Sequence, residues 1–186
     1  ITRKYRINIA GGDISGADRL IIDVSMLGVV EKRYLTLRSG AKTGDIIFVT
    51  GSLGGSILGK HLKFTPRVKE ARYLSRNFRI NSMLDISDGL SLDLAHILEQ
   101  SSVGAVIYEG LIPISHKARN LDEALCMGED FELLFTLSRQ EARKLLSKKL
   151  NIFKPIGEIV DKKLGFRLID KMNREKKIEP SGFRHF

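Results

Sequence analysis

The sequence predicts an α+β protein, in which helices and a mixed sheet pack in layers as an α/β sandwich. Short runs rich in β-branched and aromatic residues alternate along the chain with longer stretches whose apolar residues recur at helical spacing. The 186 residues and a hydrophobic content of 42% are sufficient for a substantial core. No apolar run reaches the ~20 residues that a membrane-spanning helix needs, so no membrane contact is expected.

The first thirty residues have the pattern of strands. "INIAGGD" (7–13) is typical of a strand that runs into a glycine turn, and "RLIIDVSMLGVV" (19–30) is typical of a second strand. A domain that opens within a sheet needs neighbouring strands, and we expect these to come from residues ahead of Ile1. In this interpretation residues 1–30 are the last strands of an otherwise missing N-terminal domain, and residues 31–186 form a C-terminal α/β domain.

The next elements continue the alternation. "GDIIFVTG" (44–51) predicts a strand bounded by glycines. "FTPRVKEARYLSRNF" (64–78) predicts a helix, because Thr65 is a suitable N-cap and Pro66 suits the first helical position. "MLDISDGLSLDLAHIL" (83–98) predicts a strand, a turn and then a helix from about Leu90, with Leu94, Ile97 and Leu98 facing inward.

The rest of the chain predicts further strands and one capped helix. Ser138 and Glu141 stand at capping-box spacing at the start of "SRQEARKLLSKKL", which predicts a helix. Strands are predicted at Ala105–Tyr108 and Phe131–Leu137, and weaker ones near Phe153 and Phe166.

The net charge of +9 is concentrated in one region of the chain. Between Arg139 and Glu179, thirteen basic and six acidic residues account for seven of the nine net charges. Because these basic residues alternate with apolar ones, a solvated amphipathic face is favoured, and a nucleic-acid-binding domain is the alternative. Aromatic residues at 7% and no Trp argue against a stacking platform for bases. The single Cys126 cannot form an internal disulfide, which fits a reducing, cytoplasmic compartment.

One glycine-rich stretch imitates a phosphate-binding loop. In "VTGSLGGSILGKH" (49–61), Gly54, Gly59 and Lys60 have the Walker A spacing, but His61 stands where that motif needs Ser or Thr for magnesium. The stretch is therefore interpreted as a glycine turn that lets the start of a helix pack closely on the sheet.

Asp85 and Asp88 lie where a strand is expected to give way to a helix. Mg²⁺ prefers oxygen ligands and is commonly held by one or two carboxylates together with substrate phosphates. The amides at the start of the helix from Leu90 would face the same spot, and metal and amides together favour a polyphosphate. The alternative is that Asp88 only caps the helix while Asp85 faces water.

Two further acidic turns stand at the ends of predicted strands. In "AGGDISG", Asp13 follows Gly12, so a carboxylate could hold a cation beside a backbone that a ligand can approach closely. In "MGEDFELLFT", Glu129 and Asp130 precede a strand, and Glu132 is expected to point outward. A metal-dependent phosphate site would use such acidic turns, whereas a nucleic-acid groove would avoid them.

These motifs together resemble the thiamine-monophosphate kinases over nearly the whole chain. The resemblance rests on "AGGDISG", "LRSGAKTGDIIFVTGSLGGS", "TPRV", "LDISDGLSLDLAHILEQSSVGA", "IPIS", "GEDFELLFT" and "GFRHF" in this order. D-I-S-D-G separates these kinases from the aminoimidazole ribonucleotide synthetase, selenophosphate synthetase and hydrogenase-maturation families, which share the fold and the ATP site. The implied fold is the C-terminal domain of the aminoimidazole ribonucleotide synthetase type, preceded by residual strands of an ATP-binding domain.

The resemblance implies a Mg²⁺-dependent, cytoplasmic, homodimeric kinase that transfers the γ-phosphoryl group of ATP to thiamine monophosphate, giving thiamine diphosphate. It makes Asp13, Asp85 and Asp88 the metal ligands. It assigns ATP contacts to Gly12, Asp13, Arg38 and Ser87, and contacts with the thiamine substrate to Glu129 and Phe183. No protein nucleophile is implied, because phosphoryl transfer asks mostly for positioning and neutralisation of charge.

The sequence also departs from the pattern of these kinases. The acidic G-D-D motif, further aspartates and a substrate histidine that the resemblance places in an N-terminal half are not among the 186 residues. Met127 stands where glycine is usual. A non-catalytic remnant of the fold is therefore kept as an alternative. His96 and His185 are expected to be structural, because a lone histidine beside a helix is more often satisfied locally than catalytic.

Overall fold

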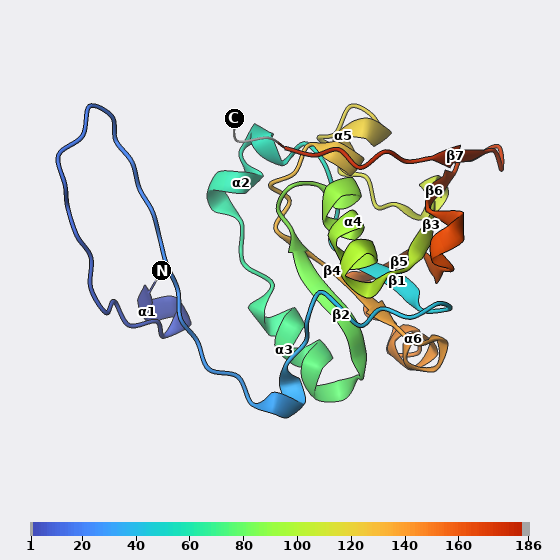
Figure 1. Cartoon of the computed structure of the whole chain (residues 1–186), viewed down its shortest axis with the longest axis horizontal. Helices are drawn as coiled ribbons and strands as arrows, with labels where there is room; N and C mark the ends of the chain where they lie inside the picture. The colour runs from blue at the N-terminus through green and yellow to red at the C-terminus, as the bar shows by residue number, and fades with distance from the viewer. Residues whose placement is uncertain (1, 184–186) are drawn as a thin grey trace. The chain divides into compact units, whose positions relative to one another are not determined.

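A computed structural model describes residues 2–183 of the chain. The chain divides into two compact units, Ile1–Val30 and Glu31–Phe186, and each is described by itself (Figure 1). Among the described residues, no helix is both long enough and apolar enough to cross a membrane.

The first unit contains one short helix, α1 (Thr2–Tyr5), and none of its described residues forms a strand. The strands predicted at 7–13 and 19–30 are therefore wrong for this structure. A strand needs a partner for its backbone N–H and C=O groups, and this unit supplies none. Leu20 and Leu27 are 89% and 104% exposed, so the apolar pattern packs no core here. That residues 1–30 belong to a missing domain stays a prediction.

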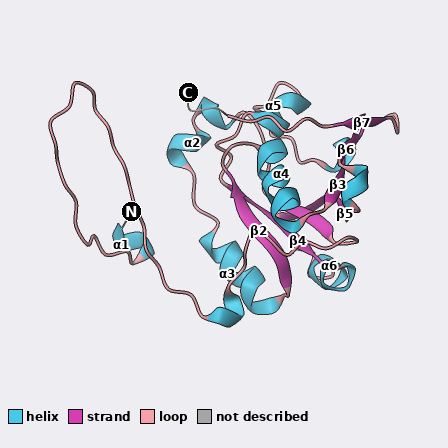
Figure 2. Ribbon diagram, in the orientation of Figure 1, coloured by secondary structure: helices cyan, strands magenta, loops and turns pink. Residues whose placement is uncertain are grey.

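The second unit is built on a seven-stranded mixed sheet with the order β2-β4-β1-β5-β3-β6-β7 (Figure 2). Strands β3 and β6 pair in parallel, and the other neighbours are antiparallel. The strands are β1 (Ile46–Thr50), β2 (Ile80–Ile86), β3 (Gly104–Tyr108), β4 (Glu132–Leu137), β5 (Phe153–Val160), β6 (Phe166–Ile169) and β7 (Glu175–Lys177). The prediction of a layered α/β sandwich is confirmed.

Between residues 31 and 183, five α-helices and four 3₁₀ turns complete this unit. The helices are α2 (Lys60–Lys63), α3 (Val68–Asn77), α4 (Leu90–Ser101), α5 (Leu121–Cys126) and α6 (Arg139–Leu146). The turns are η1 (Lys32–Tyr34), η2 (Ser56–Leu58), η3 (Glu109–Leu111) and η4 (Lys162–Leu164).

The sheet separates two apolar clusters. On one face, α4 packs its predicted inward residues against side chains of the strands, among them Ile47, Leu84 and Ile107. On the other face, Leu74 of α3 and Leu145 of α6 cover a second cluster that also contains Phe48, Phe135 and Phe153. Helices therefore cover both faces of the sheet, and consecutive residues of a central strand are buried on alternate faces.

Two helix starts show how tertiary contacts decide local structure. Ser138 caps α6 by accepting from the Glu141 N–H at 3.3 Å, as predicted, although the Glu141 carboxylate accepts from the Arg79 N–H instead of closing the capping box. The N-cap of α3 is Arg67 rather than Thr65. The segment before it stays extended, and the ring of Phe64 there stacks on that of Phe131 at 4.1 Å between centroids.

Gly157 lies in the middle of the sheet and provides a test of its packing. A Cβ added there would stand 2.1 Å from the Val106 carbonyl oxygen, which belongs to the neighbouring strand. We expect Gly157→Ala to lower the free energy of unfolding by about 1–3 kcal/mol, the usual cost of overpacking, in urea denaturation. Gly110→Ala is the control, because a Cβ there meets nothing within 4 Å. Equal losses in both variants would contradict the prediction.

Candidate functional site

The turn between β2 and α4 contains the predicted aspartate pair. Asp85 is the penultimate residue of β2, and Ser87 and Asp88 form the turn. Gly89 is the N-cap of α4 with φ +117°, and a Cβ on it would stand 3.0 Å from the Leu125 carbonyl oxygen. Glycine is therefore needed here for conformation and for close approach to α5. The predicted order of strand, turn and helix is confirmed.

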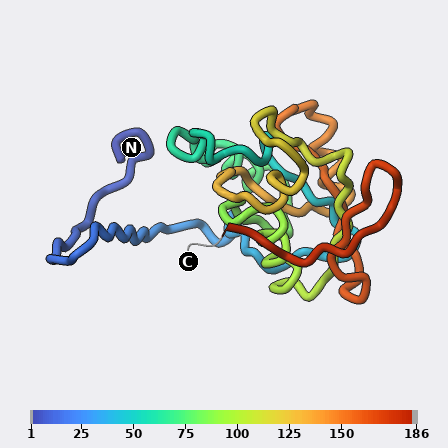
Figure 3. The backbone as a smooth tube through the Cα atoms, turned by 90° about the horizontal axis from the view of Figure 1, so that it is seen from above, coloured from blue at the N-terminus to red at the C-terminus, as the bar shows by residue number. Residues whose placement is uncertain are grey.

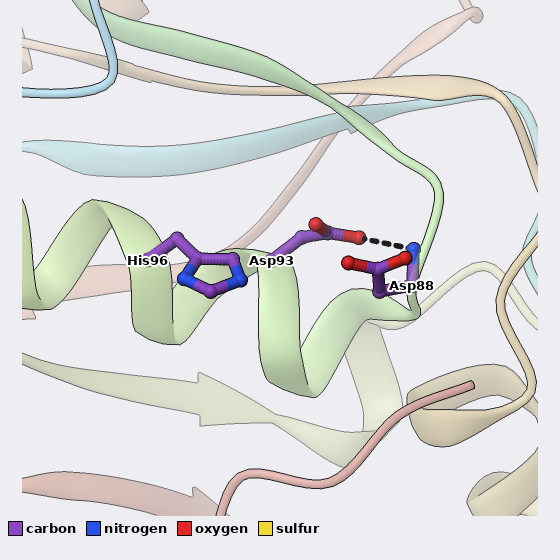
Figure 4. Close-up of side chains that lie close together, drawn as sticks. All are labelled: Asp88, Asp93 and His96. Atoms are coloured by element: carbon purple, nitrogen blue, oxygen red, sulfur yellow. Dashed lines mark hydrogen bonds between the residues drawn. The ribbon is translucent and has the colours of Figure 1, made fainter. Parts of the chain in front are cut away.

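Asp93 of α4 closes this turn. Its Oδ2 accepts hydrogen bonds from the backbone N–H groups of Ser87 at 3.0 Å, Asp88 at 3.0 Å and Gly89 at 3.1 Å. Figure 4 shows the bond from Asp88. The residue is 2% exposed, and this burial raises the pKa of Asp93 to about 6 against the opposing effect of the three amides. Asp93 was not predicted from the sequence, because Asp88 stands where a capping carboxylate is usual.

Asp88 is not the cap of α4. Gly89 is the N-cap and makes no side-chain hydrogen bond, and the Asp88 carboxylate has no hydrogen-bond donor or cationic partner among residues 2–183. Ligand atoms of Asp88, Asp93 and His96 all lie within 4.8 Å of one another. His96 was expected to be satisfied locally, but its ring has no hydrogen bond to any described group. Asp93 takes the amides of residues 87–89, while the expectation that the amides at the start of the helix from Leu90 face a phosphate stays a prediction.

The loop that carries Glu129 is bound to the same turn. The Glu129 N–H donates to the Ser87 carbonyl at 2.7 Å, and the Phe131 N–H donates to the Ile86 carbonyl at 2.8 Å. Glu129 and Phe131 have φ of 55° and 51°, a conformation that non-glycine residues rarely adopt. Two such residues in one short loop are a strained arrangement of the kind found at functional sites, held here by the surrounding contacts.

The C-terminal segment runs back from β7 across the second unit (Figure 3) and is hydrogen-bonded to the turn. The Phe183 N–H donates to the Asp88 carbonyl at 2.8 Å, and the Ser181 N–H donates to the Ser91 hydroxyl at 3.3 Å. Backbone hydrogen bonds thus bring together Ser87 and Asp88 of the turn with Glu129 and Phe183, which are far from the turn in sequence. His185 and the rest of the terminal motif after Phe183 lie outside the described residues.

Other predicted site residues lie apart from this convergence. The exposed Asp85 alternates along β2 with Leu84 and Ile86, whose side chains enter the cluster under α4, so it points to the opposite face of the sheet. Arg38 is exposed and follows Leu37, whose carbonyl accepts from the Met83 N–H on β2 at 3.0 Å. Gly12 and Asp13 belong to the first unit. The functional roles of all these residues stay predictions.

A buried charge cluster lies beside the Glu129 loop. Glu132 is 2% exposed, so the expectation that it points outward is wrong. Its carboxylate accepts from Arg67 Nε at 2.7 Å, Lys60 Nζ at 2.9 Å and Thr50 Oγ1 at 2.6 Å. Burial alone would raise the pKa of Glu132, but the hydrogen bonds from Arg67, Thr50 and Lys60 outweigh it and leave that pKa lowered.

Asp130 binds the glycine-rich stretch that imitates a Walker A loop. Its carboxylate accepts from the Gly54 N–H at 3.0 Å and from the Ser56 hydroxyl, and burial raises the pKa of Asp130. A Cβ on Gly54 would stand 2.9 Å from Ala124, so this glycine permits close packing. Protein carboxylates occupy the Gly54 amide and Lys60, so the stretch is a glycine turn as interpreted, although Gly54 packs closely against α5 rather than against the sheet.

The lowered pKa of Glu132 predicts a stability that depends on pH. Its ionised form is favoured in the fold, so the contribution is complete above its ordinary pKa near 4.5 and is lost as the pH falls below that value. We expect Tm to fall more steeply between pH 5 and pH 3 in the parent chain than in Glu132→Gln, as measured by circular dichroism. Parallel Tm curves for the two proteins would contradict the assigned role of Glu132.

Comparison with known proteins agrees with this architecture. The chain belongs to the family described as AIR synthase related protein, C-terminal domain, whose sequence profile matches residues 25–169. Among solved structures, AaThiL complexed with AMPPCP and TMP is similar with a TM-score of 0.65 and 27% identity, over 81% of this chain and 54% of that one.

Within this family the chain is similar to proteins named thiamine-monophosphate kinase. It is 37% identical over 194 residues to that of Rhodopirellula baltica and 39% identical over 218 residues to that of Buchnera aphidicola from Schizaphis graminum. The alignments cover 98% and 100% of this chain but only 60% and 66% of those relatives. The chain therefore spans less than two thirds of the curated relatives it matches.

Proposed function

We propose that the chain is the C-terminal portion of a thiamine-monophosphate kinase, which transfers the γ-phosphoryl group of ATP to thiamine monophosphate. The observation that carries this proposal is the convergence of Ser87, Asp88, Glu129 and Phe183 on one turn through backbone hydrogen bonds. These residues come from three separate segments, and the family resemblance assigns each of them a part of the same site. By the same resemblance we propose a cytoplasmic enzyme that works as a homodimer.

The carboxylates at this end of the sheet suit a hard divalent cation. Those of Asp85 and Asp88 have no donor or cation among the described residues, so their oxygens are available as ligands. We propose Asp88 as a Mg²⁺ ligand; Asp85, on the opposite face of the sheet, and Asp13 are each proposed as ligands from the family resemblance alone. The ion would supply charge neutralisation on the transferred phosphoryl group.

The protein's own residues would bind and orient the two substrates. Ser87 and the exposed Arg38 can donate hydrogen bonds to a nucleotide, and a guanidinium suits phosphate oxygens. The half-buried Phe183 offers a ring for the thiamine part, and Glu129 offers an anion that complements its cationic thiazolium. In-line transfer then depends on holding the acceptor phosphate near the γ-phosphate, which is a problem of positioning.

A direct assay tests this proposal. The complete gene product that contains the chain is incubated with ATP, MgCl₂ and thiamine monophosphate, and thiamine diphosphate is measured by chromatography. We expect Mg²⁺-dependent formation of thiamine diphosphate and ADP in equal amounts. ATP binding without any diphosphate product would overturn the proposal, and salt-sensitive binding to duplex or single-stranded oligonucleotides would favour the nucleic-acid alternative.

A further inference from the structure

In the turn at residues 86–89, the backbone N–H groups and the backbone carbonyls bond to different partners. All three N–H groups of residues 87–89 point inward to one oxygen of Asp93. The three carbonyls of residues 86–88 point outward and accept from Phe131, Glu129 and Phe183 in turn. The inward bonds therefore determine where the outward acceptors stand.

These three carbonyls bind the two segments that contain the residues proposed to contact the thiamine substrate. The loop with Glu129 is attached through the carbonyls of Ile86 and Ser87, and the segment with Phe183 through the carbonyl of Asp88. A Cβ on Gly128 would stand 2.6 Å from the Ser87 carbonyl oxygen, and one on Gly182 would stand 2.4 Å from that of Asp88. Both segments therefore lie directly against the turn and would be displaced if the turn changed shape.

Asp93 also leaves the Asp88 side chain free. Asp88 is the turn residue that would otherwise be expected to cap the helix. Because Asp93 satisfies the amides of Ser87, Asp88 and Gly89, the Asp88 carboxylate is not used in capping and projects half-buried beside Asp93 (Figure 4).

We propose that Asp93 is a positioning residue that couples the two substrate sites. By accepting hydrogen bonds from the amides of residues 87–89, it fixes the conformation of the turn. The turn then orients the Asp88 carboxylate toward the metal and nucleotide and holds the carbonyls that bind the Glu129 and Phe183 segments. The inference rests on the proposed function for its catalytic consequence. Its structural part, the gathering of the turn by one buried carboxylate, stands without that function.

The test compares three substitutions on the same helix in the complete gene product. Asp93→Leu removes the acceptor while filling the buried space, and Asp93→Asn retains one oxygen acceptor at the same position. Glu99→Gln is the matched control, because Glu99 is an exposed acidic residue of α4. Three quantities are measured: amide exchange in peptides that cover residues 84–92, the Mg²⁺ concentration for half-maximal binding of ATP in calorimetry, and KM for thiamine monophosphate.

In Asp93→Leu we expect faster exchange of the turn amides, with the Mg²⁺ requirement and KM for thiamine monophosphate both raised about 10–100-fold, the usual cost of losing a supporting residue around a metal site. In Asp93→Asn, the Mg²⁺ requirement and KM for thiamine monophosphate should return most of the way to the parent's values. In Glu99→Gln, both should equal those of the parent. A purely structural residue would change Tm alone. The proposal is overturned if Asp93→Leu exposes the turn amides but leaves both binding measurements unchanged, or if only one of the two substrates is affected.

The two proposals fail separately. If the parent protein makes no thiamine diphosphate, the proposed function fails, while amide exchange and the Mg²⁺ dependence of ATP binding still report on Asp93. Suppose instead that the parent is an active kinase and that the turn amides exchange as slowly in Asp93→Leu as in the parent. The role given to Asp93 is then wrong, and the proposed function stands.

Discussion

Asp88→Asn in the complete gene product is expected to lower kcat/KM for thiamine diphosphate formation by about 100-fold or more, the scale of removing one preorganised electrostatic contact. The amide retains the size of the side chain but loses the charge that a divalent cation requires. The free energy of unfolding should change by less than about 0.5 kcal/mol, because this carboxylate stabilises no described group. Activity is measured as thiamine diphosphate formed, by chromatography, and stability by urea denaturation.

Asp122→Asn is the control for this prediction. Asp122 is an exposed residue of α5 with no described hydrogen bond or ion pair, so the same chemical change there should leave kcat/KM and stability unaltered. Raising the MgCl₂ concentration should restore part of the lost activity in Asp88→Asn if the carboxylate binds the metal. Parallel losses of activity and stability in Asp88→Asn would instead mean that Asp88 serves the fold.

Local periodicity was sufficient to predict most of the elements of the second unit. The helix from Leu90, with Leu94 and Ile97 inward, is confirmed because its apolar spacing and the glycine before it are both local signals. Strand β7 was missed, since Glu175–Lys177 is a fully exposed polar run without alternation. The strands expected in residues 1–30 did not form because β-propensity describes a side-chain preference, whereas a strand also requires a partner for its backbone.

The buried charge cluster around Glu132 could not be predicted from the sequence. The alternation in β4 predicted that one face of the strand is exposed to solvent. Helices cover both faces of the sheet, however, so side chains on both faces of β4 are buried. A buried carboxylate then requires cations, and its partners Arg67 and Lys60 lie 65 and 72 residues away in the chain. Nothing local pairs residues at such distances.

Asp93 was overlooked for a different reason. Local capping rules look for the carboxylate at or before the first helical residue, and Asp88 matched that expectation. The structure uses a carboxylate from the first turn of α4 that reaches back to the loop, as shown by its three backbone partners. The convergence of Glu129 and Phe183 on the same turn was implied only by the family resemblance, because it depends on long-range backbone contacts.

Arg67→Met is expected to destabilise the chain by about 2–3 kcal/mol, with a drop in Tm of roughly 5–10 °C. The substitution retains the aliphatic stem and removes the guanidinium that donates to Glu132 at 2.7 and 2.8 Å. Removing one partner of a buried pair typically costs about 3–5 kcal/mol, because the other charge is left behind. The expected value is smaller, since Arg67 is 26% exposed and Lys60 and Thr50 still reach the Glu132 carboxylate.

Arg139→Met separates this effect from a general loss of positive charge. Arg139 pairs with Glu158 at 3.0 Å, but it is 66% exposed, and an exposed pair contributes about 0–1 kcal/mol. The difference between the two variants in urea denaturation therefore measures the consequence of burial. If Glu132 is the reason for the loss, the double variant Arg67→Met with Glu132→Gln should be more stable than Arg67→Met alone, because the amide is far less costly to leave without a cation. A double variant whose stability is the sum of two independent losses would show that Arg67 acts through its packing rather than through this carboxylate.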